Sequence, residues 1–226
     1  MSATELFIAL FRAVKIKDFR WWPGFGGFEV VVGAILIQNT AWRNADAALQ
    51  NLRSKGLLSL DEAELAEIIK ASGFYNQKAK RLSLLCKAII ADFGDFESFK
   101  AGVSREWLLA RKGIGAESCD AILCYACERA VMVADSYSAR LLGALGYEFE
   151  SYDELSAWLG ELEFERIYEF VNSANSPCDA AAKADKLENE NGVYALFHGL
   201  IVEFCKAHLK GRIFDDFAIE FFDNLK

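Results

Sequence analysis

The chain has 226 residues, enough to bury a substantial core in one domain or in two small interlocked domains. Its formal net charge of −8 excludes a generally basic surface, although a local basic stripe is compatible with an acidic protein. No apolar run approaches the roughly 20 residues that cross a bilayer, and the first residues do not resemble a signal peptide, so we expect a cytoplasmic protein without a membrane partner.

The composition favours an all-helical fold. Only two residues are proline, and the alternation of apolar and polar residues that marks strands is scarce. Near the N-terminus, Leu6, Phe7, Leu10, Phe11 and Val14 recur at helical spacing, which predicts an amphipathic first helix.

An aromatic segment, residues 19–28, follows this helix and reads FRWWPGFGGF. Its glycines and proline predict a loop. The aromatic side chains either plug the edge of a core or form a stacking wall for a flat, positively charged base. Both interpretations stay open for Trp22, whereas Phe19 and Phe28 are expected in the core.

The next segments predict helices joined by short turns. The apolar run 28–37 favours a buried helix over a buried strand, because it continues into the polar stretch 38–45. A capped helix with acidic residues in its first turn is expected over 59–69. Further on, we expect Gly73 to end a helix and Asn76 to cap the next one.

A second group of signals surrounds Gly113-Ile114-Gly115, which lies between two apolar helical segments. Ser104 is expected to cap the first of these, Arg105–Arg111. Glycine accepts positive φ, and amides at the start of the second helix favour a phosphate, although a plain corner between helices would look the same.

Asp135 stands alone after the apolar residues 131–134 and just before a helical segment, 139–145. An aspartate at a helix N-terminus commonly caps the helix, and capping lowers its pKa and keeps it ionised. Near the C-terminus, residues 193–206 predict a long apolar helix, in which His198 is expected to be a satisfied core histidine and Lys206 a solvated lysine.

Together, several motifs between residues 29 and 142 resemble the helix-hairpin-helix DNA glycosylases of the endonuclease III superfamily. The Gly113–Gly115 turn matches the family's L-P-G-[VI]-G, with Lys112 in place of proline. Asp135 falls at the catalytic aspartate, preceded by Ala134 where the family has valine. The stretches 36–40 and 73–79 resemble the family's L-[LS]-x-Q-[NT] and G-[LF]-Y-N-x-K-A elements. The FHG motif, 197–199, resembles the 3-methyladenine branch.

The resemblance implies an all-α fold of two domains. A helical barrel containing the helix-hairpin-helix would span 29–133. A second helical domain, 1–28 plus 134–226, would be formed by both chain ends and would carry Asp135.

The resemblance also implies roles for individual residues. Asp135 would stabilise the cationic sugar and orient the attacking water. Gln38 would fill the gap left by the flipped nucleotide. The expected base pocket consists of Trp22, Trp42 and Phe25. The expected contacts to the DNA backbone are Lys112, Gly113, Gly115 and Lys78.

The activity implied is removal of an alkylated base, 3-methyladenine above all, from double-stranded DNA by a monomeric enzyme. Bifunctional relatives need an amine nucleophile two residues after the second glycine of the turn, where this chain has Glu117, so no lyase step is expected. A glycosylase for damaged or mismatched pyrimidines is an alternative, and a non-catalytic DNA-binding protein is another.

We expect no cofactor. Only Cys178 and Cys205 follow Asp135, too few for the iron–sulfur cluster of some relatives. The pair Cys124 and Cys127 is expected to be reduced and in the core, not a metal site. As in relatives, a monovalent cation could bind the backbone carbonyls of the Gly113–Gly115 turn.

Overall fold

The structure is a computed structural model that describes residues 1–16, 18, 20–53, 55, 60–173 and 187–225. Phe19, Ser59 and Cys178 therefore lie outside the described residues. The chain divides into unit 1, Met1–Trp22 with Glu128–Lys226, and unit 2, Pro23–Cys127. The sequence had placed these limits at residues 29 and 133.

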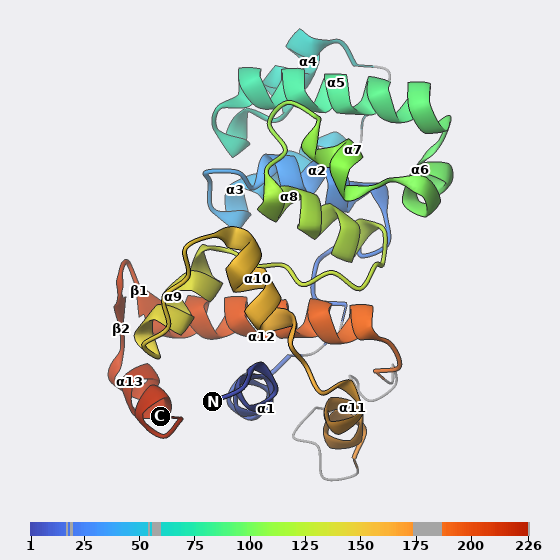
Figure 1. Cartoon of the computed structure of the whole chain (residues 1–226). Coiled ribbons are helices and arrows are strands. Elements are labelled where there is room, and N and C mark those ends of the chain that lie inside the picture. The colour runs from blue at the N-terminus through green and yellow to red at the C-terminus, as the bar shows by residue number, and fades with distance from the viewer. Residues whose placement is uncertain (17, 19, 54, 56–59, 174–186, 226) are drawn as a thin grey trace. The chain divides into compact units, whose positions relative to one another are not determined.

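The expected all-α fold is confirmed. Helices form both units, and the strands among the described residues are two short segments of two residues each (Figure 1). No helix in the described part of the chain is long and apolar enough to cross a membrane.

Unit 2 is built around α2, Phe28–Leu36, whose residues from Val30 onward are all buried. The expected helix, rather than a strand, is therefore confirmed for this apolar run. The remaining elements of unit 2 are α3 (Trp42–Arg53), α4 (Glu62–Ile68), a 3₁₀ turn (Lys70–Ser72), α5 (Tyr75–Phe93), α6 (Phe96–Gly102), α7 (Arg105–Leu109), α8 (Ala116–Ala121) and a π-helical turn (Ile122–Ala126).

The helix termini in unit 2 agree with the predicted caps only in part. Ser104 caps α7, as expected, by accepting the N–H of Trp107. The expected cap at Asn76 is wrong. Gly73 and Phe74 both have positive φ, so the chain turns sharply there, Phe74 is the N-cap, and α5 begins at Tyr75, two residues earlier than a cap at Asn76 would give. Asn76 consequently lies inside the first turn of α5.

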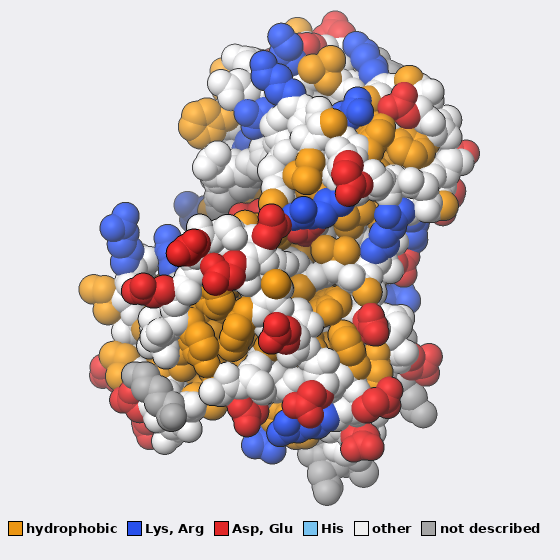
Figure 2. Space-filling view, viewed as in Figure 1, with side chains coloured by type: hydrophobic (Ala, Val, Ile, Leu, Met, Phe, Trp, Pro, Cys, Tyr) orange, Lys and Arg blue, Asp and Glu red, His pale blue; other side chains and the backbone are white. Residues whose placement is uncertain are grey.

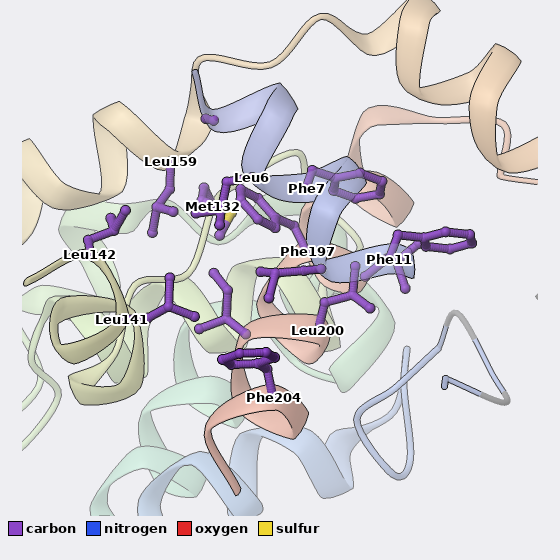
Figure 3. Packing of buried hydrophobic residues seen from close by; sticks show 14 of the residues in the cluster. Leu6, Phe7, Phe11, Met132, Leu141, Leu142, Leu159, Phe197, Leu200 and Phe204 are labelled. Carbon is purple, nitrogen blue, oxygen red and sulfur yellow. The ribbon is translucent and has the colours of Figure 1, made fainter. Parts of the chain in front are cut away.

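Unit 1 is built around the long helix α12, Glu190–His208. Leu6 and Phe7 of α1 are fully buried, and Phe7 meets Phe197 of α12 edge to face at 5.4 Å (Figure 3). Burying each such side chain contributes about 1.5–3 kcal/mol relative to exposure. The elements of unit 1 are α1 (Ala3–Ala13), α9 (Ser136–Ala144), α10 (Tyr152–Gly160), α11 (Phe164–Asn172), α12, β1 (Leu209–Lys210), β2 (Ile213–Phe214) and α13 (Asp216–Asp223).

Gly199 lets the Trp21 indole approach the backbone of α12. A Cβ at this glycine would lie 2.7 Å from Cγ of Trp21, so the indole would have to move. We expect Gly199→Ala to lower the free energy of unfolding by about 1–3 kcal/mol through overpacking. This effect should outweigh alanine's gain of about 1 kcal/mol in helix propensity. Urea denaturation measures the net change.

The matched control is Gly143→Ala in α9, where a Cβ would meet nothing within 4 Å. This variant should be more stable than the wild type, by up to about 1 kcal/mol, because only propensity changes. If Gly199→Ala were as stabilising as Gly143→Ala, the close packing of Trp21 on α12 would be wrong.

Candidate active site

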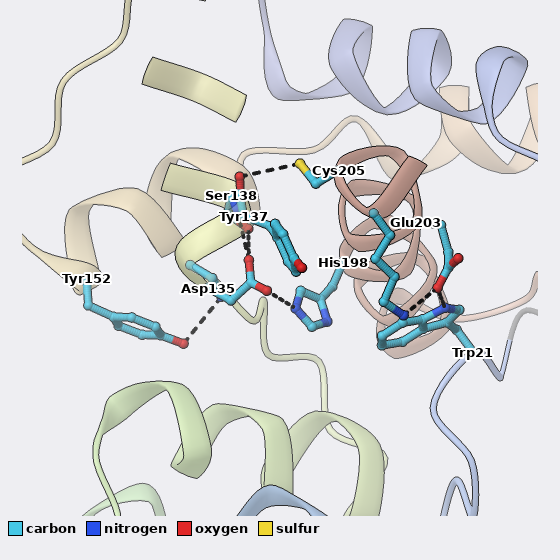
Figure 4. A network of polar contacts seen from close by, with 10 residues as sticks. Trp21, Asp135, Tyr137, Ser138, Tyr152, His198, Glu203 and Cys205 are labelled. Carbon is cyan, nitrogen blue, oxygen red and sulfur yellow. Dashed lines mark hydrogen bonds and ion pairs between the residues drawn. The ribbon is translucent and has the colours of Figure 1, made fainter. Parts of the chain in front are cut away.

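Asp135 forms the N-cap of α9 in unit 1. Its Oδ1 accepts hydrogen bonds from the backbone N–H of Ser138 at 2.8 Å and from the Ser138 hydroxyl at 3.1 Å. Its Oδ2 lies 3.6 Å from Nε2 of His198 on α12 (Figure 4). The side chain is 15% exposed, so the carboxylate is mostly buried but still reaches solvent.

These contacts determine the charge of Asp135. Burial would raise the pKa of this carboxyl, but the neighbouring His198 ring and the hydrogen bonds from Ser138 outweigh burial. The net effect is a pKa below the ordinary value of 3.8. Asp135 is therefore an anion at neutral pH, as its capping position predicted.

A series of aromatic contacts in unit 1 leads away from this carboxylate. The His198 ring meets the edge of Trp21 at 5.7 Å, and Trp21 meets Trp22 at 6.1 Å. Trp21 also donates its indole N–H to Glu203 at 3.1 Å. Trp22, a predicted base-pocket residue, is therefore connected through Trp21 to His198, the neighbour of Asp135.

His198 is the functional candidate that the sequence did not single out. It is buried, with 4% of its side chain exposed, as the expected core histidine would be. However, it also lies beside the one carboxylate to which the sequence assigned chemistry. The motif 197–199 resembles the 3-methyladenine branch, but nothing local in the sequence indicates which residue His198 faces.

The three predicted base-pocket residues belong to different units. Trp22 lies in unit 1 and is buried, with 7% of the residue exposed. Trp42 begins α3 in unit 2 and is half-buried. Phe25, also half-buried in unit 2, meets the edge of Tyr125 at 5.9 Å. A common pocket for these residues stays a prediction.

The Gly113–Gly115 turn connects α7 to α8 in unit 2. Gly113 has φ +89°, which a residue with a side chain rarely adopts, and Gly115 is the N-cap of α8. Ile114 points inward and is 7% exposed, whereas Lys112 and Gly115 are exposed. The turn thus presents backbone and one lysine to solvent, which is the geometry that a backbone-phosphate contact requires.

Gln38, the predicted wedge, is bonded directly to this turn. Its amide Nε2 donates to the carbonyl oxygen of Gly113 at 2.9 Å and to Oγ of Ser118 at 3.0 Å. Its Oε1 accepts from Nη1 of Arg81 at 2.9 Å. A Cβ at Gly113 would collide with the Arg81 guanidinium, so Arg81 covers the turn as well. Unit 2 therefore brings the wedge candidate and the turn together around one arginine.

Lys78 does not lie where a DNA phosphate could reach it. The residue is 1% exposed, and its ammonium donates to the carbonyl oxygens of Leu36 at 2.8 Å and Ser72 at 2.7 Å. Burial, together with the nearby Arg81 cation, lowers its pKa to about 8. The geometry argues against the expected phosphate contact. Lys78 instead bonds the carbonyl groups at the ends of α2 and of the 3₁₀ turn, which have no partner within their own helices.

The thiols of the described residues are packed in the two cores. Cys124 and Cys127 are buried and form no disulfide. Burial raises the pKa of Cys86 to about 11, which leaves this thiol protonated and unreactive at neutral pH. Among the described residues, no group of three or more His, Cys, Asp or Glu side chains could hold a metal ion.

The sequence of the chain is similar to those of known DNA repair proteins. Residues 32–161 match the HhH-GPD superfamily of base excision DNA repair proteins. A provisionally named DNA repair glycosylase of Methanocaldococcus jannaschii is 37% identical over 209 residues, covering 87% of this chain and 84% of that protein.

Solved structures extend the comparison. The 3-methyladenine DNA glycosylase of H. pylori, bound to 1,N6-ethenoadenine, matches with a TM-score of 0.79 at 38% identity, over 93% of this chain and 100% of that one. A trapped endonuclease III–DNA covalent intermediate matches with a TM-score of 0.60 at 16% identity, over 82% of this chain and 76% of that one, and shares the fold.

The contacts of Asp135 generate a prediction about its titration. In His198→Leu the imidazole is lost, and only Ser138 still lowers the pKa of Asp135 against the effect of burial. The pKa of Asp135 should therefore rise. His198→Gln, whose amide can still donate to the carboxylate, should keep the pKa closer to that of the wild type. Carboxyl ¹³C NMR titration of Asp135 measures all three proteins. A midpoint that is the same in the wild type and in His198→Leu would show that His198 does not hold the charge.

Proposed function

The chain belongs to the HhH-GPD superfamily of base excision DNA repair proteins, and we propose that, as a DNA glycosylase, it releases alkylated bases, above all 3-methyladenine. The observation that carries the proposal is the Asp135 carboxylate, which is ionised and fixed at the N-cap of α9. The proposed enzyme is monofunctional and acts as a monomer on double-stranded DNA.

The proposed chemistry needs an anion at a fixed position. Cleavage of an N-glycosidic bond passes through a transition state with positive charge on the sugar, and a carboxylate beside that sugar stabilises the charge. The same carboxylate can orient the water that attacks the sugar carbon. Ser138 fixes one oxygen of Asp135, so the carboxylate need not reorganise as charge develops.

The proposed substrate class follows from the leaving group. An adenine methylated at a ring nitrogen is positively charged, leaves without prior protonation, and is attracted to an aromatic face such as that of Trp22. The 38% identity to the H. pylori 3-methyladenine glycosylase over nearly the whole chain supports this class. The match to endonuclease III, at 16% identity, supports the fold alone.

The proposed grip on DNA uses the two elements that unit 2 holds together. The backbone of Gly113 and Gly115, with the exposed Lys112, would bind a phosphate at the start of α8. Gln38, bonded to the same turn, would be inserted into the duplex from a position fixed relative to that phosphate.

The proposed absence of a lyase step rests on Glu117. This exposed carboxylate lies in the first turn of α8, where a bifunctional relative needs a lysine. A carboxylate cannot form the Schiff base with the sugar that strand cleavage requires.

The substrate proposal is tested by base release from matched duplexes. One set carries 3-methyladenine, 7-methylguanine or 1,N6-ethenoadenine, and the other carries uracil, a thymine mismatch or thymine glycol. We expect release of 3-methyladenine at the highest rate, no release of pyrimidines, and no covalent product with abasic DNA under borohydride, as followed by chromatography and gel electrophoresis.

Three other outcomes would contradict the proposal in different ways. Faster release of a damaged or mismatched pyrimidine would establish the alternative glycosylase, and borohydride trapping would establish a lyase. If the protein bound every duplex but released no base from any of them, it would be a DNA-binding protein without catalysis.

A further inference from the structure

The charge of the chain is distributed unevenly between the units. Unit 2 holds 12 basic and 12 acidic residues, whereas unit 1 holds 13 basic and 21 acidic residues and so carries the whole net charge of −8. A polyanion is repelled by such a unit unless cations are gathered locally. A group of exposed cations in unit 1 is therefore a candidate contact for a polyanion.

Three exposed cations converge at the turn between β1 and β2. Lys210 and Arg212 flank Gly211 in this turn, and Nη1 of Arg140 on α9 donates to the Gly211 carbonyl oxygen at 3.3 Å. Figure 1 shows β1 and β2 beside α9, and Figure 2 shows Lys and Arg side chains at the left edge over this turn. We call Arg140, Lys210 and Arg212 the β-turn cluster.

The turn is a well-defined element. Leu209 pairs with Phe214 and Lys210 with Ile213, and Gly211 has φ +67°, which closes the turn tightly. At its base, Asp215 donates its N–H to the His208 carbonyl oxygen at 2.9 Å. The two short strands therefore hold Lys210 at a fixed distance from α12.

The acidic residues that follow the turn belong to the start of α13, where the Ala218 N–H, helped by the charge of Lys210, lowers the pKa of Asp215. One carboxylate oxygen of Asp215 caps α13 by accepting the Ala218 N–H at 3.0 Å, and the other contacts His208 at 3.0 Å. Asp216 belongs to the first turn of α13. In the part of the chain that the structure describes, no salt bridge joins the β-turn cluster to an acidic side chain.

The position of the cluster relative to Asp135 is set within unit 1. Arg140 follows Asp135 by five residues on α9, which is about 7.5 Å along the helix axis. Phosphates of one DNA strand recur about every 3.4 Å along the duplex axis. An axial offset of this size corresponds to roughly two phosphates, so a strand that places a sugar at Asp135 and runs along α9 would bring phosphates of its own strand near the cluster.

We propose that Arg140, Lys210 and Arg212 form a second binding site for backbone phosphates, on the strand that carries the excised nucleotide. This inference rests on the proposed function, because Asp135 defines which strand is meant. The site gives unit 1 its own contact with DNA, in addition to the Gly113–Gly115 turn of unit 2. It carries no information about the base.

The test measures binding without base release. The ligand is a duplex with a tetrahydrofuran abasic analogue, which has no base to release, titrated at several salt concentrations. In Lys210→Gln/Arg212→Gln, the slope of log K against log salt should fall by about 0.9 for each phosphate that is no longer neutralised, about 1.8 in all. The affinity near physiological salt should fall roughly tenfold.

The matched control removes the same charge elsewhere in unit 1. Arg12 and Arg166 are exposed on α1 and α11, where they line a separate hollow of about 640 Å³. Arg12→Gln/Arg166→Gln should leave the salt slope within error of the wild type. Equal slopes for the two double variants would overturn the proposal, since net charge alone would then explain the effect.

A chemical change in the DNA locates the phosphates that are bound. Neutral methylphosphonates, placed one to three nucleotides from the analogue on its own strand, should abolish the difference between the wild type and Lys210→Gln/Arg212→Gln. If the difference persisted, or vanished only with the opposite strand modified, the assigned strand would be wrong. A normal salt slope together with no base release from any lesion would refute the proposed function and leave the phosphate site standing.

Discussion

The candidate active site depends most on the contacts that hold the Asp135 carboxylate. One oxygen is fixed by Ser138 at the start of α9, and the other faces His198 on the central helix of unit 1. Burial favours the neutral acid, so the anion persists only because Ser138 and the neighbouring His198 ring outweigh it. The hydrogen bond that caps α9 thus also keeps the candidate catalytic residue ionised. A change that displaced α12 would move His198 and so alter the surroundings of the carboxylate.

In unit 2, Arg81 likewise contacts two candidate functional elements at once. This residue bonds Gln38 and covers Gly113, so the wedge candidate and the candidate phosphate-binding turn share one support. Gln38 bonds a residue 75 positions further along the chain. A shift of either element would therefore move the other.

Local features of the fold could be predicted from the sequence, because they depend on neighbouring residues. The cap at Asp135, the buried helix α2 and the glycine turn are features of this kind. Contacts between distant segments could not be predicted. His198 looks like any lone histidine in an apolar helix, and Lys78 looks like a surface lysine, until tertiary packing places one beside a carboxylate and buries the other.

The charge distribution gives the two units different tasks in binding a polyanion. Unit 2 is electrically balanced and presents backbone amides, which attract phosphate without net charge. Unit 1 is acidic, carries the candidate catalytic anion, and concentrates exposed cations beside α9.

The most direct measurement is single-turnover release of 3-methyladenine by the wild type and by Asp135→Asn, with the affinity of each for an abasic-analogue duplex. For Asp135→Asn we expect a rate lower by roughly two to three orders of magnitude with nearly unchanged affinity, whereas release at the wild-type rate would show that this carboxylate does not carry the chemistry.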